Sequence, residues 1–249
     1  MTNLAIITHI EEFSMNAWPS IGSLHDDGWV LQFGEGYSRR ANAIYPLYAG
    51  SQGLAEKLTA CEALYRAKGQ PVIFKMTDAS QPAQLDETLA ASGYQTDART
   101  AVQMRNLAAW SGDADADVTL SDTPTREWLN AFCYMRGLSD AHRAIHERIT
   151  RSILPEKRFA SFTRNGRIVA CGLGVLQSGW IGFYDISTDE SVRRQGHALK
   201  VMQTLLAWAK SAGAHDAYLQ VMVDNAPALA LYEKLGFKEA YQYWYRIKT

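Results

Sequence analysis

The repeated order of helices and strands constrains the fold of this chain more than any other feature of its sequence. The second half ends in a predicted helix, strand, short helix and strand, over 199–209, 217–223, 228–235 and 241–247. Apolar residues spaced three and four apart predict the long helix. Glycines, Gly213 and Gly236, stand where the two helices end, as is common at helix C-termini. This order is typical of a mixed α/β domain.

The first half ends in the same order of elements, over 54–68, 72–76, 83–92 and 100–107. Gly69 and Gly93 close its helices, so that Gly69 precedes Gly213 by 144 residues and Gly93 precedes Gly236 by 143. One offset, kept within a single residue across four elements, predicts a duplicated unit. Because helix–strand alternation is common, coincidence is the alternative.

A small, acidic stretch without apolar periodicity, SGDADAD, separates the two halves at residues 111–117. We interpret it as a linker and expect one domain over 1–110 and another over 118–249. A strand and two helices open the second domain. Asn165–Gly166 then predicts a tight hairpin, and a strand over 180–188 follows it.

Composition excludes several classes of function. Apolar residues form 47% of the 249 residues, which suffices for a core, and the net charge of −1 gives no reason to expect nucleic acid as a partner. No apolar run approaches the ~20 residues of a membrane span, and the N-terminus has no basic leader. Three separated cysteines without a CxxC motif predict neither disulfides nor a metal site. We expect a cytoplasmic protein without metal, nucleic acid or membrane.

The start of the second-domain helix has the features of an anion site. The first N–H groups of a helix have no internal partner, and that end of the helix dipole is positive. Gly196 and the small Ala198 let a phosphate approach the backbone, while Arg193 and Arg194 add positive charge. The loop is therefore interpreted as a diphosphate cradle, with an ordinary basic helix start as the alternative.

From about residue 118 to its end, the chain resembles the GCN5-related N-acetyltransferases (GNATs). VRRQGHA, residues 192–198, is similar to the family's Q/R-x-x-G-x-G/A loop. VDNAPALALYEKLGF, residues 223–237, is similar to its N-x-x-A-x-x-x-Y-x-x-x-G-F ending. The resemblance implies a mixed α/β fold of two GNAT-like units. Each has a mostly antiparallel central sheet, helices on both faces and a splayed strand pair at the acyl-CoA site.

The resemblance also implies acetyl-CoA as the donor. Main-chain N–H groups of 194–198 would hold its pyrophosphate, and the end of the 180–188 strand would pair with its pantetheine arm. The implied cofactor-binding residues are Ile186, Thr188, Arg193, Arg194, Gln195, Gly196, His197, Ala198 and Asn225. Asn225 is equally suited to capping the helix near Pro227. Lys200 and Lys234 either approach the adenosine phosphate or remain solvated.

The same family implies a direct attack of an amine on the thioester. Tyr232 occupies the position of the acid that protonates the leaving thiolate, with a core tyrosine as the alternative. Asp185 is the candidate base, and the alternatives are a solvated or structural aspartate or a chain of waters. Tyr184, His142 and His146 are further candidates, of which the two histidines share one helix face.

The first half is expected to be a degenerate unit that walls the acceptor site. Leu89 stands where Tyr232 stands, and the loop 49–54, AGSQGL, has no arginine. Arg39 and Arg40 lie on a predicted strand within 36–46, where one would clamp an acceptor carboxylate. A structural ion pair or a solvated side chain is the alternative.

The sequence thus predicts an acetyl-CoA-dependent N-acetyltransferase acting on the primary amine of a small molecule or peptide. Tyr184, Arg39 and Arg40 are its predicted substrate-binding residues. The alternative is a catalytically inactive acyl-CoA sensor or partner-binding module on the same fold. Either a monomer or a homodimer is compatible with two fused halves.

Overall fold

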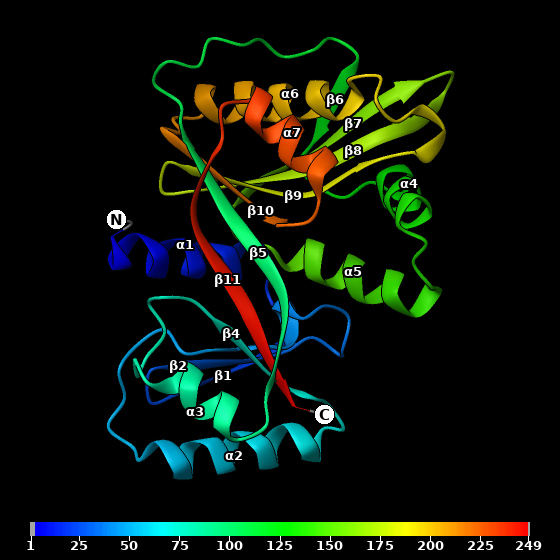
Figure 1. The fold of residues 1–249 in the computed structure, drawn as a ribbon. Helices are drawn as coiled ribbons and strands as arrows, with labels where there is room; N and C mark the ends of the chain where they lie inside the picture. Colours follow the sequence, from blue (N-terminus) through cyan, green and yellow to red (C-terminus); the bar gives the residue numbers. More distant parts are fainter. Residues whose placement is uncertain (1–2, 249) are drawn as a thin grey trace. The chain divides into compact units, whose positions relative to one another are not determined.

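The computed structural model describes residues 3–248 and divides into two compact units (Figure 1). Unit 1 takes the chain up to Ala101, together with Met222–Asp224 and the chain from Ala240 onward. Unit 2 comprises Val102–Val221 and Asn225–Glu239. Two long strands, β5 (Gln95–Asn106) and β11 (Lys238–Lys248), have residues in both units. The boundary predicted at 111–117 is inferred from the repeated order of elements and not from compact packing. It stays a prediction.

Unit 1 contains sheet strands in the order β1-β2-β3-β4-β11-β5, with helices on both faces of β4. Its other strands are β1 (Gly22–Asp26), β2 (Trp29–Phe33), β3 (Ile44–Tyr45) and β4 (Val72–Met76). Its helices are α1 (Leu4–Ala17), α2 (Leu54–Ala67), α3 (Leu85–Ala91) and the 3₁₀ turn η1 (Arg40–Asn42).

Every residue of β4 is buried, and successive side chains point to opposite faces of the sheet. Phe74 lies in the apolar cluster formed with α2 and α3. Lys75 lies on the other face, where it pairs with Glu11 of α1. Both partners are almost fully buried, so the ion pair lets a lysine occupy a core strand.

Unit 2 contains a sheet in the order β10-β9-β8-β7-β6. The strands are β6 (Val118–Ser121), β7 (Glu156–Arg164), β8 (Arg167–Gln177), β9 (Trp180–Thr188) and β10 (Asp216–Met222). The helices are α4 (Arg126–Arg136), α5 (Asp140–Ser152), α6 (His197–Ser211), α7 (Ala226–Lys234) and the 3₁₀ turn η2 (Glu190–Val192).

Side chains cap three of these helices at their first turns. The Thr125 and Ser139 hydroxyls accept N–H groups of the first turns of α4 and α5, and Asn225 does the same for α7. Gly137 ends α4 in the left-handed conformation that glycine adopts most readily.

The two faces of β8 carry different helices. A Cβ built on Gly172 or Gly174 would meet side chains of α6, so the bare glycines let this helix approach the sheet. On the opposite face, Trp128 of α4 donates its indole N–H to the carbonyl of Ala160 on β7. Helices therefore flank the unit 2 sheet on both sides, as the sequence predicts.

Strands β9 and β10 pair in parallel only at their beginnings. The register runs from Trp180 opposite Asp216 to Phe183 opposite Leu219 and ends there, although both strands continue. On its other edge, β9 pairs antiparallel with β8, with a bulge between the Cys171 and Leu173 positions. The predicted splay is therefore present, because β10 does not pair with 184–188.

The predicted fold class, mixed α/β with mostly antiparallel pairing and helices on both faces, is confirmed. One expected strand is wrong: within 36–46 only Ile44 and Tyr45 form a strand, because the chain turns through η1 before them. Strand β1 is missing from the sequence prediction. Its five residues are mostly exposed and show no apolar alternation.

Candidate functional site

A groove of about 1020 Å³ lies in unit 2 between the start of α6, the end of β9 and the helix α7. Eight of the nine predicted cofactor-binding residues line it, all except Gln195, and so does Tyr232. The lining also includes Met135 and Arg136 at the end of α4, which sequence reasoning missed. A basic residue such as Arg136 in the last turn of a helix is too common to indicate a binding site.

The loop that enters α6 has an unusual backbone. Arg194 and Gly196 both have positive φ, +62° and +83°. A Cβ built on Gly196 would meet no atom within 4 Å, so the glycine leaves open space beside the first turn of the helix. Lys200 N–H bonds to the Gly196 carbonyl, whereas the N–H groups of the first turn have no partner within the helix. These groups and the open space form the cradle predicted for a diphosphate.

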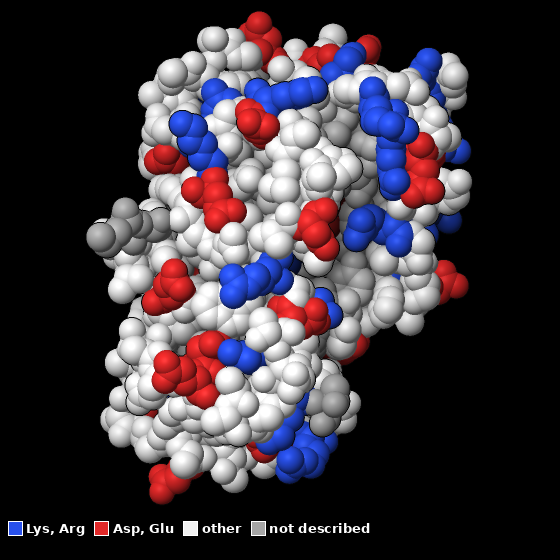
Figure 2. Space-filling model, viewed as in Figure 1, with Lys and Arg blue, Asp and Glu red and all other residues white. Residues whose placement is uncertain are grey.

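The charges around the groove are mainly positive. Figure 2 shows basic side chains gathered over the region between α7 and α4. Arg193 pairs with Glu190 at 3.0 Å. Within residues 3–248 no partner is recorded for the side chains of Arg136, Arg194 or Lys234, which all line the groove. This excess of positive charge suits an anionic ligand.

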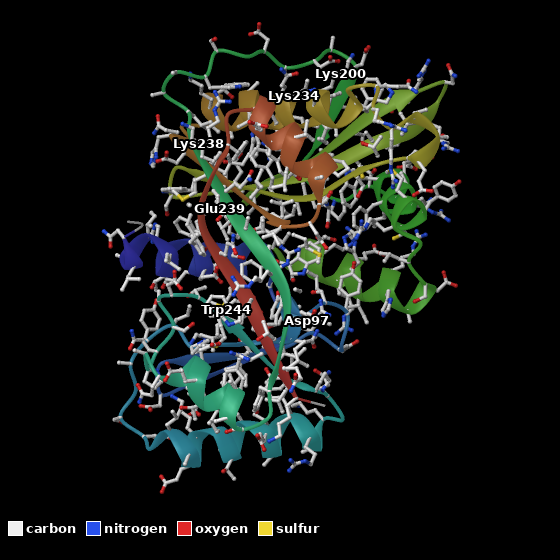
Figure 3. All side chains as sticks on the ribbon, in the orientation of Figure 1. Asp97, Lys200, Lys234, Lys238, Glu239 and Trp244 are labelled. Atoms are coloured by element: carbon white, nitrogen blue, oxygen red, sulfur yellow. The ribbon has the colours of Figure 1, made fainter. Side chains whose placement is uncertain are left out.

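The two lysines considered for the adenosine phosphate differ in their placement (Figure 3). Lys200 on α6 pairs with Asp115 at 3.0 Å and Asp117 at 3.4 Å, and these carboxylates raise its pKa. Lys200 is therefore held by the two carboxylates of the 111–117 segment. Lys234, at the end of α7, lines the groove.

Tyr232 projects from α7 into the groove lining, and its ring is almost fully buried. Burial raises the pKa of its hydroxyl to about 12, so the group keeps its proton at neutral pH. The Asn225 side chain accepts the Ala228 N–H at 3.3 Å, which is the capping geometry. The further contact of Asn225 with pantetheine stays a prediction.

Asp185 lies beside the bulge of β9 with φ +55°, a conformation rare for residues other than glycine. Its Oδ2 lies 2.8 Å from Nε2 of His146 on α5. The His146 ring stacks on Phe132 and Trp128 of α4 and has no exposed surface. His142, one turn earlier on α5, is exposed. The structure therefore joins Asp185 to one of the two candidate histidines.

The predicted acceptor residues lie apart from the groove lining. Tyr184 is buried, and its hydroxyl is 2.9 Å from that of Tyr218. In unit 1, Arg39 forms an ion pair with Asp97, and Arg40 lies 5.5 Å from the ring centroid of Trp18. The two arginines begin the η1 turn, so the expectation that they occupy a strand is wrong. Their role toward an acceptor stays a prediction.

The loop 49–54 of unit 1 is filled by a side chain of the protein. The Asp27 carboxylate accepts the N–H groups of Ser51 and Gln52, each at 2.9 Å, and Lys57 pairs with it at 3.3 Å. These bonds hold the pKa of Asp27 well below its usual range. A Cβ on Gly50 would clash with Asp27, so this close approach requires glycine.

Within residues 3–248 no group of three or more His, Cys, Asp or Glu side chains is arranged to bind a metal. In the same range, no helix combines the length and the apolar character that crossing a bilayer requires.

Comparison with known proteins identifies the family. The sequence model described as "Probable histone acetyltransferase Rv0428c C-terminal" matches residues 5–246. The chain belongs to this family of GCN5-related N-acetyltransferases. It is 28% identical to "Uncharacterized N-acetyltransferase YobR" of Bacillus subtilis over 246 residues, which are 97% of this chain and 98% of that protein.

Two further GNAT relatives are similar over different lengths. The ribosomal protein bS18-alanine N-acetyltransferase of Escherichia coli is 31% identical over 86 residues, 34% of this chain and 58% of that protein. A solved GCN5-related N-acetyltransferase from Kribbella flavida has a TM-score of 0.71 and 15% identity, and the match covers 98% of this chain and 95% of that one. The second likeness shows the fold alone. GNAT acetyltransferases use acetyl-CoA, and this protein is an acetyl-CoA-dependent N-acetyltransferase.

Proposed function

We propose that this protein binds acetyl-CoA in the unit 2 groove and transfers the acetyl group to the primary amine of a small molecule or a peptide. The observation that carries the proposal is the left-handed loop at Gly196, which leaves open space beside the N–H groups of α6. That cradle lies in the same groove as the end of β9, where the strands splay.

Residues on both sides of the groove would hold the donor. The N–H groups of 194–198 would bind the pyrophosphate, with Arg193, Arg194 and Arg136 adding charge. The main chain of Ile186 and Thr188 would pair with the pantetheine arm as an added strand. When bound there, acetyl-CoA supplies the activated thioester.

Tyr232 is the proposed general acid. Its hydroxyl is protonated at neutral pH and lies in the groove lining, so it is suited to donating a proton to the leaving thiolate. Burial of the ring keeps the hydroxyl in a fixed place during the transfer. This arrangement supports catalysis over a sensor that only binds acyl-CoA.

Asp185 is the proposed base that takes a proton from the attacking amine. The His146 imidazole is fully buried, whereas the Asp185 side chain keeps some exposure, so Asp185 is the member of the pair that a substrate can reach. His146 is a positioning residue in this proposal, because its contact at 2.8 Å holds one oxygen of the carboxylate and leaves the other for the amine.

The name of one relative bears on the acceptor class. The relative from E. coli is named for an alanine of a ribosomal protein, which favours an α-amino group among the open acceptors. We propose Tyr184, Arg39 and Arg40 as the residues to test for acceptor binding. The first half is interpreted as a degenerate unit, and the Asp27 carboxylate in its loop supports an inability to hold a second donor.

Two experiments test the function. Isothermal titration measures acetyl-CoA binding, and a screen of amino acids, polyamines and short peptides with CoA release as readout finds the acceptor. The proposal requires both donor binding and amine-dependent CoA release. Donor binding without release for any amine would favour the acyl-CoA sensor instead.

A further inference from the structure

The tip of the β7–β8 hairpin contacts both ends of the loop that forms the donor cradle. Asn165 and Gly166 turn the hairpin with positive φ values of +50° and +71°. This two-residue turn places Arg164 directly opposite Arg167 in the register. The two guanidinium groups therefore emerge together at the end of the hairpin.

Arg164 contacts the end of the donor loop. Its Nη1 donates to Oε1 of Gln195 at 2.7 Å. Gln195 lies between the two left-handed residues, Arg194 and Gly196, and is the one predicted cofactor-binding residue outside the groove lining. Its side chain therefore faces the hairpin, and its contact holds the backbone of the cradle.

Arg167 contacts the start of the same loop through the Asp189 carboxylate. The other oxygen of Asp189 accepts the Ser191 N–H at 3.0 Å and the Ser191 hydroxyl at 2.6 Å. The Asp189 N–H donates to the Val169 carbonyl of β8. These bonds to Ser191, with the nearby arginine, keep the pKa of Asp189 below its usual range, so the carboxylate is ionised at neutral pH.

The hairpin also reaches the other wall of the groove. The Arg167 guanidinium lies 5.5 Å from the ring centroid of Tyr134 on α4. The next two residues of α4, Met135 and Arg136, line the groove. Arg167 therefore contacts the loop on one side of the groove and the helix on the other.

A third contact comes from β7, the strand that also carries Arg164. The ring of Phe162 on β7 stacks on that of His197, the first residue of α6, with centroids 4.5 Å apart. Residues 162, 164 and 167 thus contact the loop at 197, 195 and 189, and pairing of β7 with β8 fixes their spacing.

We propose that the β7–β8 hairpin tip is a brace that sets the shape of the donor groove, with Arg164 and Arg167 as positioning residues for acetyl-CoA. The proposal rests on donor binding in this groove, as proposed above. Neither arginine lines the groove, so each acts through the loop rather than through the ligand. Loss of the brace therefore weakens donor binding and leaves the chemical step intact.

The test compares Arg164→Gln, Arg167→Gln and the double variant with Arg151→Gln. Arg151 is an exposed arginine paired with Glu147 on α5, so it controls for the loss of a surface charge. We expect the KM and Kd for acetyl-CoA to rise about threefold to tenfold in each single variant and further in the double variant. Each single variant removes only one of the two arginine contacts that hold the loop, whereas the double variant removes both. The kcat at saturating donor stays near that of the wild type, and Arg164→Lys recovers part of the affinity.

Hydrogen exchange of the 189–199 segment supplies a readout that does not depend on activity. Faster exchange in the double variant without ligand, together with weaker donor binding, supports the brace. Donor affinity and exchange equal to those of Arg151→Gln overturn it. If the wild-type protein itself binds no acetyl-CoA, the proposed function fails and the brace fails with it, a result distinct from wild-type binding with unaffected variants.

Discussion

His146 Nε2 lies 2.8 Å from Asp185 Oδ2, although the two residues are 39 positions apart in the chain. The imidazole is buried against aromatic rings of α4, while the carboxylate lies at the bulge where β9 leaves β10. A buried ring that holds one carboxylate oxygen in a fixed place is suited to positioning a base.

The Asp185–His146 pair is expected to affect the chemical step and leave donor binding unchanged. Asp185→Asn should lower kcat about 100-fold, because an amide cannot take the amine proton. His146→Phe keeps an aromatic ring in the stack but removes the contact, and should lower kcat about tenfold. His142→Gln on the exposed side of α5 is the control. Steady-state kinetics with both substrates varied would measure these effects, and normal turnover of Asp185→Asn would exclude it as the base.

Tyr232→Phe removes the proposed acid and retains the buried ring. We expect kcat to fall about 100-fold, because the thiolate then leaves without a proton donor. The Kd for acetyl-CoA should stay the same, since the main chain of the loop holds the phosphates. Stopped assays of CoA release and isothermal titration measure the two quantities, and full activity would show that another group is the acid.

Gly196→Ala and Gly213→Ala separate backbone strain from ligand binding. Both glycines have positive φ, +83° and +91°, and a Cβ at either meets no atom within 4 Å. Each substitution should cost about 1 kcal/mol of stability for the left-handed conformation. Only Gly196→Ala should also weaken acetyl-CoA binding, because only its Cβ fills the cradle. Equal donor affinities in the two variants would contradict the site.

The buried His197 side chain leads us to expect a lower stability of the fold in acid. Burial, with Arg164 and Lys200 nearby, lowers the pKa of its imidazole below the usual 6.5. The unfolded chain therefore takes up the proton more readily, and stability is full above 6.5 and falls as the pH drops below it. His197→Phe should reduce the loss of unfolding free energy between about pH 7.5 and about pH 5.5. Urea denaturation at both pH values measures this, and the same loss in both proteins would exclude His197 as its source.

Asp27→Ala should destabilise the protein without affecting the donor. The variant leaves N–H groups of Ser51 and Gln52 without their carboxylate and Lys57 without its partner. Asp97→Ala, which removes an exposed partner of Arg39, should have a smaller effect. Thermal unfolding measures the difference, and acetyl-CoA titration should be unchanged for both. An unchanged melting temperature for Asp27→Ala would show that the carboxylate does not anchor this loop.

Local patterns in the sequence determined most of the secondary structure and part of the candidate site. The apolar spacing of α6, the Asn165–Gly166 turn and the capping residue Asn225 of α7 act over a few neighbouring positions, so they are visible in the chain. The basic loop and Gly196 were recognisable for the same reason. Exposed β1 and the turn at Arg39 were not, because neither has a regular apolar alternation.

Only the tertiary structure decided which distant residues meet. It joins Asp185 to His146, Gln195 to Arg164 and Asp27 to the loop at Ser51, contacts between residues 24 or more positions apart. Such contacts depend on how strands pair and how helices pack against them, which no local pattern encodes. The chemistry of each side chain was therefore readable from the sequence, whereas its partner was set by the packing of the whole unit.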